Sequence, residues 1–185
     1  MNEPRPLSIY VHQAAAICAQ GGDLHAIGER IFSDQPAPLT VSDHYSSGRA
    51  LPLGLVNDLP LLADTRNNSL LAATLLPLRA EVAALQEKFG AHRIGVILGS
   101  STSGIAEGEA ALATYLETGA LPKAFHYGQQ ELSAPALYVA RELQVTGPAW
   151  TISTACTSGA KAVASGARLL HLGVCDAVIV GGADS

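Results

Sequence analysis

The sequence of 185 residues has few of the features that disulfide-rich, zinc-binding, nucleic-acid-binding or membrane proteins need. Its three cysteines, Cys18, Cys156 and Cys175, are far apart and form no CxxC pair, which argues against a disulfide framework or a zinc site and favours a reducing cytoplasm. No two basic residues are adjacent and the formal net charge is −5, so nothing predicts binding to nucleic acid or to an anionic membrane. No apolar stretch approaches the roughly 18 residues of a membrane helix. The sequence therefore predicts a cytoplasmic protein, and it contains no signal for a metal or a cofactor.

Apolar residues make up 48% of the sequence, which is enough to bury one sizeable core or to form a large piece of something bigger. Near the start, Leu7–Val11 predicts a buried strand. A secretion signal is disfavoured there because His12 and Gln13 interrupt the apolar region. The stretch from Asp34 to Leu62 holds several Pro and Gly residues and predicts a long surface loop, and the helical region after it should be divided at Pro77.

From residue 93 onward, short apolar runs alternate with helical patterns. Strands are expected at Arg93–Leu98, Ala149–Ser153 and Ala177–Val180, and helices at Ser103–Glu117, Ser133–Leu143 and Cys156–Leu172. The hydroxyl of Ser103 is suited to capping its helix. Strands that alternate with helices at this spacing form βαβ units, so the sequence predicts an α/β protein with a mainly parallel sheet and helices on both faces.

Cys156 is the residue that carries the most chemical information, because it lies where a strand gives way to a helix. Backbone N–H groups at the start of a helix lack intrahelical partners, and the helix dipole adds partial positive charge there. A thiolate is stabilised at such a position, and the same N–H groups can donate to the oxyanion that forms when a thioester is attacked. One face of the helix consists of small apolar residues, Ala160, Val163, Ala164 and Ala167. A helix of this kind suits a central position that would bury Cys156 at the end of a substrate tunnel.

The local pattern alone leaves two interpretations of Cys156 equally open. It can be a nucleophile, or it can be a small buried hydrophobic residue, which is the commoner fate of a free cysteine. Cys18 and Cys175 fit the second description. Asp184, which follows two glycines, is expected to satisfy the backbone of a turn rather than to act as an acid or base.

Two segments resemble the β-ketoacyl synthase family of thiolase-like condensing enzymes. The family's active-site segment is similar to TACTSG at Thr154–Gly159, to the Ala-rich helix after it, and to GVCDAVIVGGADS at Gly173–Ser185. The strand and glycine-rich turn ahead of the insertion that borders the family's acyl pocket are similar to RIGVILGSSTSG at Arg93–Gly104. Leu7–Gly22 departs from the family, because it lacks the usual opening strand with its Val-Thr-Gly turn.

The resemblance implies a three-layer α/β/α thiolase-like fold with a mainly parallel, mixed sheet. It implies that residues 1–185 are the N-terminal domain of a 3-oxoacyl-[acyl-carrier-protein] synthase, an acyltransferase of fatty acid, polyketide or polyene synthesis, with the C-terminal half absent. Cys156 would accept an acyl group from acyl carrier protein, and that group would condense with the carbanion formed when malonyl-acyl carrier protein loses carbon dioxide. The backbone N–H of Cys156 would be one oxyanion donor.

The same resemblance implies partners and missing groups. The partners are acyl carrier protein and a related subunit, in a homodimer or a heterodimer, paired across a two-fold axis through the strand that ends near Ser153 and Thr154. The family's remaining catalytic groups, two histidines and a supporting lysine, belong to the C-terminal half, and Lys161 is not that lysine. The six histidines here are read as structural or exposed: His12, His25, His44, His92, His126 and His171. His126 and Tyr127 are expected in a solvated loop.

Four alternatives stay open beside a synthase. A chain-length-determining partner subunit would share the fold, but such partners usually lack the cysteine. A thiolase also uses an acylated cysteine, although TACTSGAKA fits the synthases better. A cysteine hydrolase would need a nearby histidine base, and none can be placed. The chain as given could also be a non-catalytic truncated module.

Overall fold

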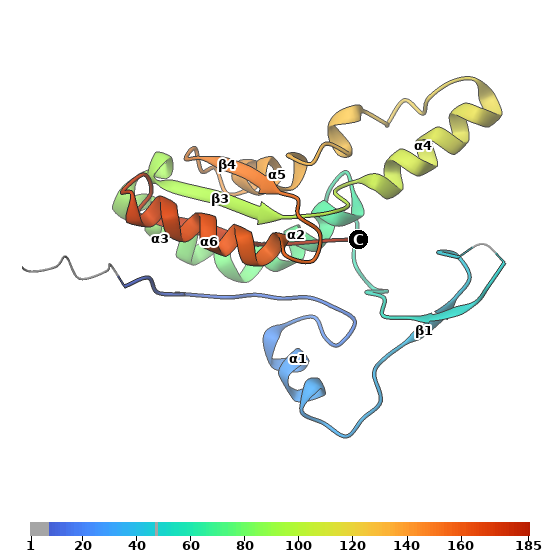
Figure 1. Cartoon of the computed structure of the whole chain (residues 1–185), viewed down its shortest axis with the longest axis horizontal. Helices are drawn as coiled ribbons and strands as arrows, with labels where there is room; N and C mark the ends of the chain where they lie inside the picture. The colour runs from blue at the N-terminus through green and yellow to red at the C-terminus, as the bar shows by residue number, and fades with distance from the viewer. Residues whose placement is uncertain (1–7, 47) are drawn as a thin grey trace, which may run out of the picture.

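A three-stranded parallel sheet forms the centre of the structure (Figure 1). In the computed structural model, which describes residues 8–46 and 48–185, its strands are β3 (Ile94–Gly99), β4 (Ala149–Ile152) and β5 (Ala177–Gly182), in the order β4-β3-β5. Ile97 of β3 lies opposite Trp150 on one side and Val180 on the other. The predicted parallel sheet is confirmed, and no antiparallel strand joins it within the described ranges.

The two faces of β3 are built differently, because successive side chains of a strand point to opposite sides. Ile94, Val96 and Leu98 belong to a buried apolar cluster with residues of three helices, α2 (Arg66–Leu75), α3 (Arg79–Phe89) and α5 (Ala134–Glu142). On the other face, the buried side chain of Ile97 lies between Gly95 and Gly99, and helix α6 (Ser158–His171) packs there against β3 and β5. Helices thus cover both faces, and the predicted three-layer α/β/α architecture is confirmed.

Helix α6 lies against the sheet through its smallest residues. Ser158, Ala162 and Gly166 are its buried positions. A Cβ atom added at Gly166 would lie 2.6 Å from Val180 Cγ1 of β5, so glycine is needed for the observed separation of helix and strand. The opposite face, with Ala160 and Val163, is exposed. The helix therefore packs against the sheet on one side, and on the other side Val163 shares a hollow with the N-terminal segment.

The long helical region divides where the sequence predicts. A 3-10 turn, η1 (Leu76–Leu78), contains Pro77 and separates α2 from α3. Further along, α4 (Ile105–Thr118) projects away from the sheet, as Figure 1 shows. The remaining short turns are η2 (Ala91–Arg93) and η3 (Tyr127–Gln129).

The N-terminal part of the chain forms an extension beside the sheet (Figure 1). It contains the helix α1 (Leu24–Ile31). Within Asp34–Leu62, the segment predicted as a loop, two short antiparallel strands form, β1 (Thr40–Ser42) and β2 (Leu51–Leu53). The predicted strand at Leu7–Val11 is wrong for residues 8–11, and Leu7 lies outside the described residues. The segment pairs with no strand in the described ranges and lies along α3 and α6, held by a bond from Gln13 Nε2 to the Pro77 carbonyl (2.8 Å).

None of the helices in the described ranges has the length and apolar character required to cross a bilayer.

One ion pair joins the start of β3 to the link between α6 and β5. Arg93 Nε lies 2.6 Å from Asp176 Oδ2, and Arg93 Nη1 donates to the Val174 carbonyl at 3.0 Å. The hydrogen bond from Arg93 holds the pKa of the Asp176 carboxyl below its ordinary value. A lowered carboxyl pKa stabilises the fold above the unfolded-state value, about 4, and this contribution is lost as the pH falls through the folded-state pKa.

Asp176→Asn is therefore expected to lower the thermal unfolding midpoint at pH 7. The difference from the parent should shrink as the pH falls below the unfolded-state pKa of about 4, where unfolded Asp176 takes up a proton before the folded carboxyl does. Unfolding followed by circular dichroism between pH 7 and pH 3 measures the gap. Glu87→Gln, at an exposed position with no side-chain partner in the described residues, removes the same charge and is the control. A gap that stays constant down to pH 3 would refute the linkage.

Candidate functional site

Cys156 lies in the turn between β4 and α6, at the carboxyl edge of the parallel sheet. This edge is where open α/β sheets commonly bind ligands. The thiol is exposed. The helix begins at Ser158, two residues later than predicted, because Ala155 adopts a left-handed φ of 53° that a helix cannot include. Cys156 nevertheless directly precedes the N-cap residue, Thr157, and lies at the positive end of the helix dipole.

Two hydroxyl groups hold the turn around Cys156. Ser158 Oγ accepts a hydrogen bond from the Thr154 N–H (2.8 Å) and donates to the Ala155 carbonyl (2.7 Å). Thr157 Oγ1 donates to the Thr154 carbonyl (2.8 Å). The residues on both sides of Cys156 are thus tied to one another, so a backbone conformation that is unusual for alanine is maintained.

The turn rests directly on β3. A Cβ atom added at Gly99 would lie 2.5 Å from the carbonyl carbon of Ser158 and 2.6 Å from the nitrogen of Gly159. These contacts are too short for any side chain, so glycine is required at the end of β3 for the start of α6 to occupy its position. The position of the cysteine turn is therefore fixed by a contact between two backbones.

The three cysteines have different surroundings. Cys175 is 2% exposed, and burial raises the pKa of its thiol. It fits the predicted role of a core residue. Cys18 was expected to be a core residue as well, but it is exposed in a short turn where its backbone exchanges hydrogen bonds with Gly21. Cys156 and Cys18 are therefore the two thiols open to solvent, and only Cys156 lies next to a helix N-terminus.

The predicted tunnel around Cys156 is not formed by the described residues. A hollow of about 460 Å³ lies between α4 and the loop after it, lined by Ile105, Leu112, Leu121 and Phe125 among others. A second lies between the N-terminal segment, α3, α6 and β5. Cys156 lines neither of these two hollows.

The turn after β3 lies at the same edge of the sheet. The prediction that Asp184 satisfies turn backbone is confirmed, since its carboxylate accepts hydrogen bonds from the N–H groups of Ser101 (2.6 Å) and Thr102 (3.3 Å). The prediction that Ser103 caps α4 is wrong. Ser103 has a φ of 49°, its hydroxyl donates to the Glu131 carbonyl (2.8 Å), and the N-cap residue is Gly104.

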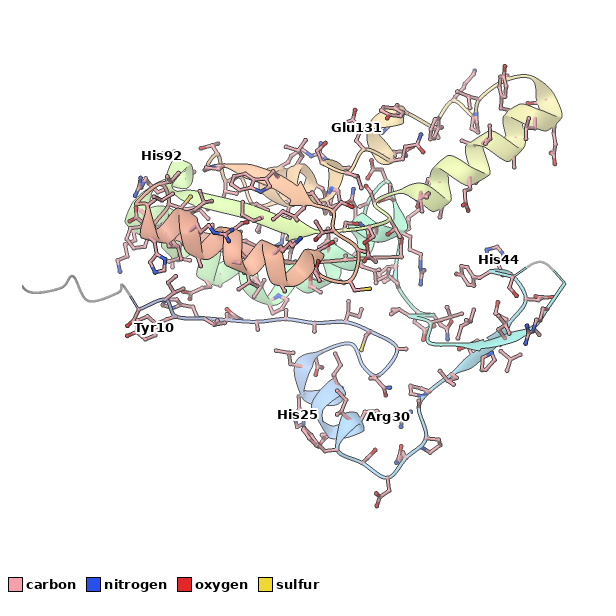
Figure 2. All side chains as sticks on the ribbon, viewed as in Figure 1. Tyr10, His25, Arg30, His44, His92 and Glu131 are labelled. Carbon is pink, nitrogen blue, oxygen red and sulfur yellow. The ribbon has the colours of Figure 1, made fainter. Side chains whose placement is uncertain are left out.

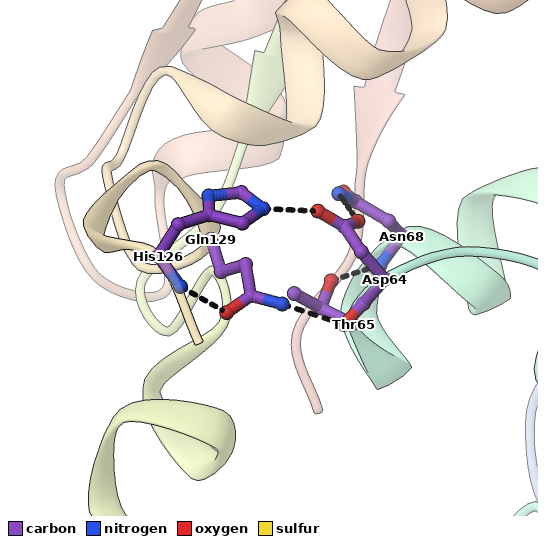
Figure 3. Close-up of polar contacts among 5 residues, drawn as sticks. All are labelled: Asp64, Thr65, Asn68, His126 and Gln129. Carbon is purple, nitrogen blue, oxygen red and sulfur yellow. Dashed lines mark hydrogen bonds and ion pairs between the residues drawn. The ribbon is translucent and has the colours of Figure 1, made fainter. Parts of the chain in front are cut away.

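The histidines do not gather at Cys156. All six are exposed, as predicted, and Figure 2 shows His25, His44 and His92 on three separate parts of the molecule. His126 pairs with Asp64 (Nε2 to Oδ2, 3.6 Å), as Figure 3 shows, and the buried side chain of Gln129 links the same loop to the start of α2. This cluster anchors the loop that contains Tyr127.

The described residues hold no group of three or more His, Cys, Asp or Glu side chains arranged to bind a metal ion. Lys161 lies within α6 and is exposed. Ser158 is the residue of the cysteine turn that sequence reasoning missed, although a hydroxyl at the first position of a helix is a recognisable signal.

Comparison with known proteins relates this geometry to one family. The family model for the N-terminal domain of β-ketoacyl synthases matches residues 79–185, which include Cys156. The whole chain matches a chain of the complex of the ketosynthase ApeO with its chain length factor ApeC from Xenorhabdus doucetiae, with 35% identity and a TM-score of 0.86. The match covers 49% of that chain, so the present chain spans about half its length.

A β-ketoacyl synthase from Burkholderia phymatum STM815 is more distant, with 26% identity, a TM-score of 0.44, and coverage of 60% of this chain and 26% of that one. No curated protein matches the chain.

Ser158→Ala is expected to lower the free energy of unfolding by about 1–3 kcal/mol, because it leaves the Thr154 N–H without its acceptor at a buried position. The Ala155 carbonyl loses the hydroxyl but keeps its bond from the Ser158 N–H (3.0 Å). Chemical denaturation measures the loss. Ser165→Ala, on the same helix and without a hydrogen bond of its hydroxyl in the described residues, is the matched control. Equal stability of the two variants would show that the Ser158 hydroxyl does not hold the turn.

Proposed function

The chain belongs to the β-ketoacyl synthase family, and from that premise we propose that it is the acyl-accepting domain of a 3-oxoacyl-[acyl-carrier-protein] synthase. In this proposal Cys156 is the nucleophile. The observation that carries it is an exposed thiol, held in a braced turn immediately before the N-terminus of a 14-residue helix, inside the region that the family model matches.

The proposed reaction has two steps. The Cys156 thiolate attacks the carbonyl carbon of an acyl thioester on acyl carrier protein, and the carrier thiolate leaves and takes up a proton. Malonyl-carrier protein then loses carbon dioxide, and the resulting carbanion attacks the acyl carbonyl on Cys156 to form the 3-oxoacyl product and release the Cys156 thiolate. The start of α6 favours both steps, since its partial positive charge stabilises the thiolate and the Cys156 N–H can donate to the developing oxyanion.

We propose that residues 1–185 act as the N-terminal domain of a larger catalytic unit. Two observations support this. The small-residue face of α6, with Ala160, Val163 and Ala164, is exposed, and the chain covers 49% of the ApeO–ApeC complex chain that it matches. A second domain on that face would enclose Cys156 and would bring the two histidines and the lysine that the family uses for decarboxylation.

The partner is proposed to be a related subunit. The similar Xenorhabdus structure is a ketosynthase bound to its chain length factor, which favours a heterodimer over a homodimer for this chain. The opposite assignment, in which this chain is itself the chain-length subunit, is disfavoured by the presence of Cys156. A thiolase is disfavoured by the match to the synthase family model.

If Cys156 is the acyl acceptor, a thiol-directed acyl analogue should modify it several-fold faster than Cys18, because only Cys156 lies beside helix N–H groups that can donate to the developing oxyanion. Cys175 should react most slowly, since it is buried. Peptide mapping by mass spectrometry measures the three rates in one sample, with unfolded protein as the control for intrinsic reactivity. Equal rates at Cys156 and Cys18 would count against the proposal.

The same preparation tests whether the condensation step requires a second domain. Supplied with acyl- and malonyl-carrier proteins, the chain of 185 residues is expected to release no 3-oxoacyl product, because the groups proposed to stabilise the decarboxylation enolate are not among its residues. Sustained turnover by the pure chain would contradict this.

A further inference from the structure

The carboxylate of Asp184 collects hydrogen bonds from one turn. Its Oδ1 accepts from Ser100 Oγ (3.1 Å), Ser101 N (2.6 Å), Thr102 N (3.3 Å) and Thr102 Oγ1 (3.2 Å). Asp184 follows β5, and the turn follows β3, so this one oxygen joins the carboxyl ends of two neighbouring strands. Hydrogen bonds to an ionised acceptor are stronger than those to a neutral one.

Ser100 extends this hydrogen-bond network from the turn to β4. Its buried hydroxyl donates to Asp184 and accepts from the Ser103 N–H at 2.9 Å, which maintains Ser103 at its left-handed φ of 49°. The Ser100 N–H donates to the Ile152 carbonyl at 3.2 Å. Ile152 is the last residue of β4, so Ser100 is bonded to the chain just before the Cys156 turn.

The strand end held by Asp184 also supports the other side of the Cys156 turn. The Ala183 N–H donates to the Gly99 carbonyl (3.2 Å), and Gly99 lies directly against Ser158. Ser158 in turn bonds Thr154 and Ala155. The restraint therefore reaches Cys156 from both sides, through Ile152 and through Ser158.

We propose that Asp184 is a positioning residue for Cys156: its carboxylate fixes the Ser100–Thr102 turn and thereby the orientation of the thiol at the start of α6. This inference rests on the proposed function of Cys156 and adds a residue to that site. The contacts of the Asp184 side chain are to the turn, so its role is to hold geometry and not to transfer a proton.

The test compares Asp184→Ala and Asp184→Asn with the parent protein. The ratio of the modification rates of Cys156 and Cys18 by a thiol-directed acyl analogue is measured in each, so that Cys18 serves as an internal standard. Asp184→Ala is expected to lower the ratio about fivefold. Asp184→Asn, whose amide oxygen still accepts hydrogen bonds but carries no charge, is expected to recover at least half of that loss but not all of it. Asp58→Ala, at an exposed position without a side-chain partner in the described residues, should leave the ratio unchanged.

Hydrogen exchange of residues 153–158 provides a readout that does not depend on thiol chemistry. It should accelerate at least threefold in Asp184→Ala and remain near the parent value in Asp58→Ala. A parent ratio near one would defeat the proposed function, and the exchange data alone would then decide whether Asp184 holds the turn. A high parent ratio, with ratio and exchange both unchanged in Asp184→Ala, would overturn the positioning role and leave the proposed function standing. If Asp184→Ala does not fold, a smaller loss of the same sign in Asp184→Asn supports the role, and no loss refutes it.

Discussion

The contact on which the site depends is that between the end of β3 and the first residues of α6. At Gly99 the strand backbone contacts the helix backbone so closely that a Cβ atom added there would lie only 2.5 Å from the Ser158 carbonyl carbon. A thiol has a fixed orientation only if the turn that carries it has one conformation. Here the hydrogen bonds of the Ser158 hydroxyl and the backbone contact at Gly99 hold that turn. The strain at Ala155 persists because these contacts determine the backbone on both sides of Cys156.

The other face of α6 accounts for the exposure of the cysteine. The helix buries Ser158, Ala162 and Gly166 against the sheet and leaves Ala160 and Val163 uncovered. Small apolar residues on an exposed helix face allow a second layer to approach closely. In the proposed function, a second domain would close over this face and complete a pocket around Cys156.

Much of the architecture could be predicted from local sequence, and the failures have a common cause. β3, β4 and β5 were predicted within two residues of their ends, because buried parallel strands are short apolar runs with turn residues after them. Pro77 divides the helical region as its missing N–H requires. The strand predicted near the N-terminus, the helix start at Cys156 and the cap at Ser103 were wrong, because these residues make contacts that a local pattern does not specify. The N-terminal segment lies along α3 and α6, the Ser158 hydroxyl closes a turn ahead of the helix, and Ser103 bonds the distant Glu131 carbonyl. The acyl-accepting role of Cys156 came from a resemblance in its motif and stays a prediction.

The most direct test of this account is acyl transfer from an acyl-carrier-protein thioester to the parent chain and to Gly99→Ala, followed by intact mass and peptide mapping. The account predicts a single acyl group on Cys156 in the parent and at least a tenfold slower transfer in Gly99→Ala, because the added Cβ must push the start of α6 away from β3. Acylation at another residue, or equal transfer rates in the two proteins, would contradict it.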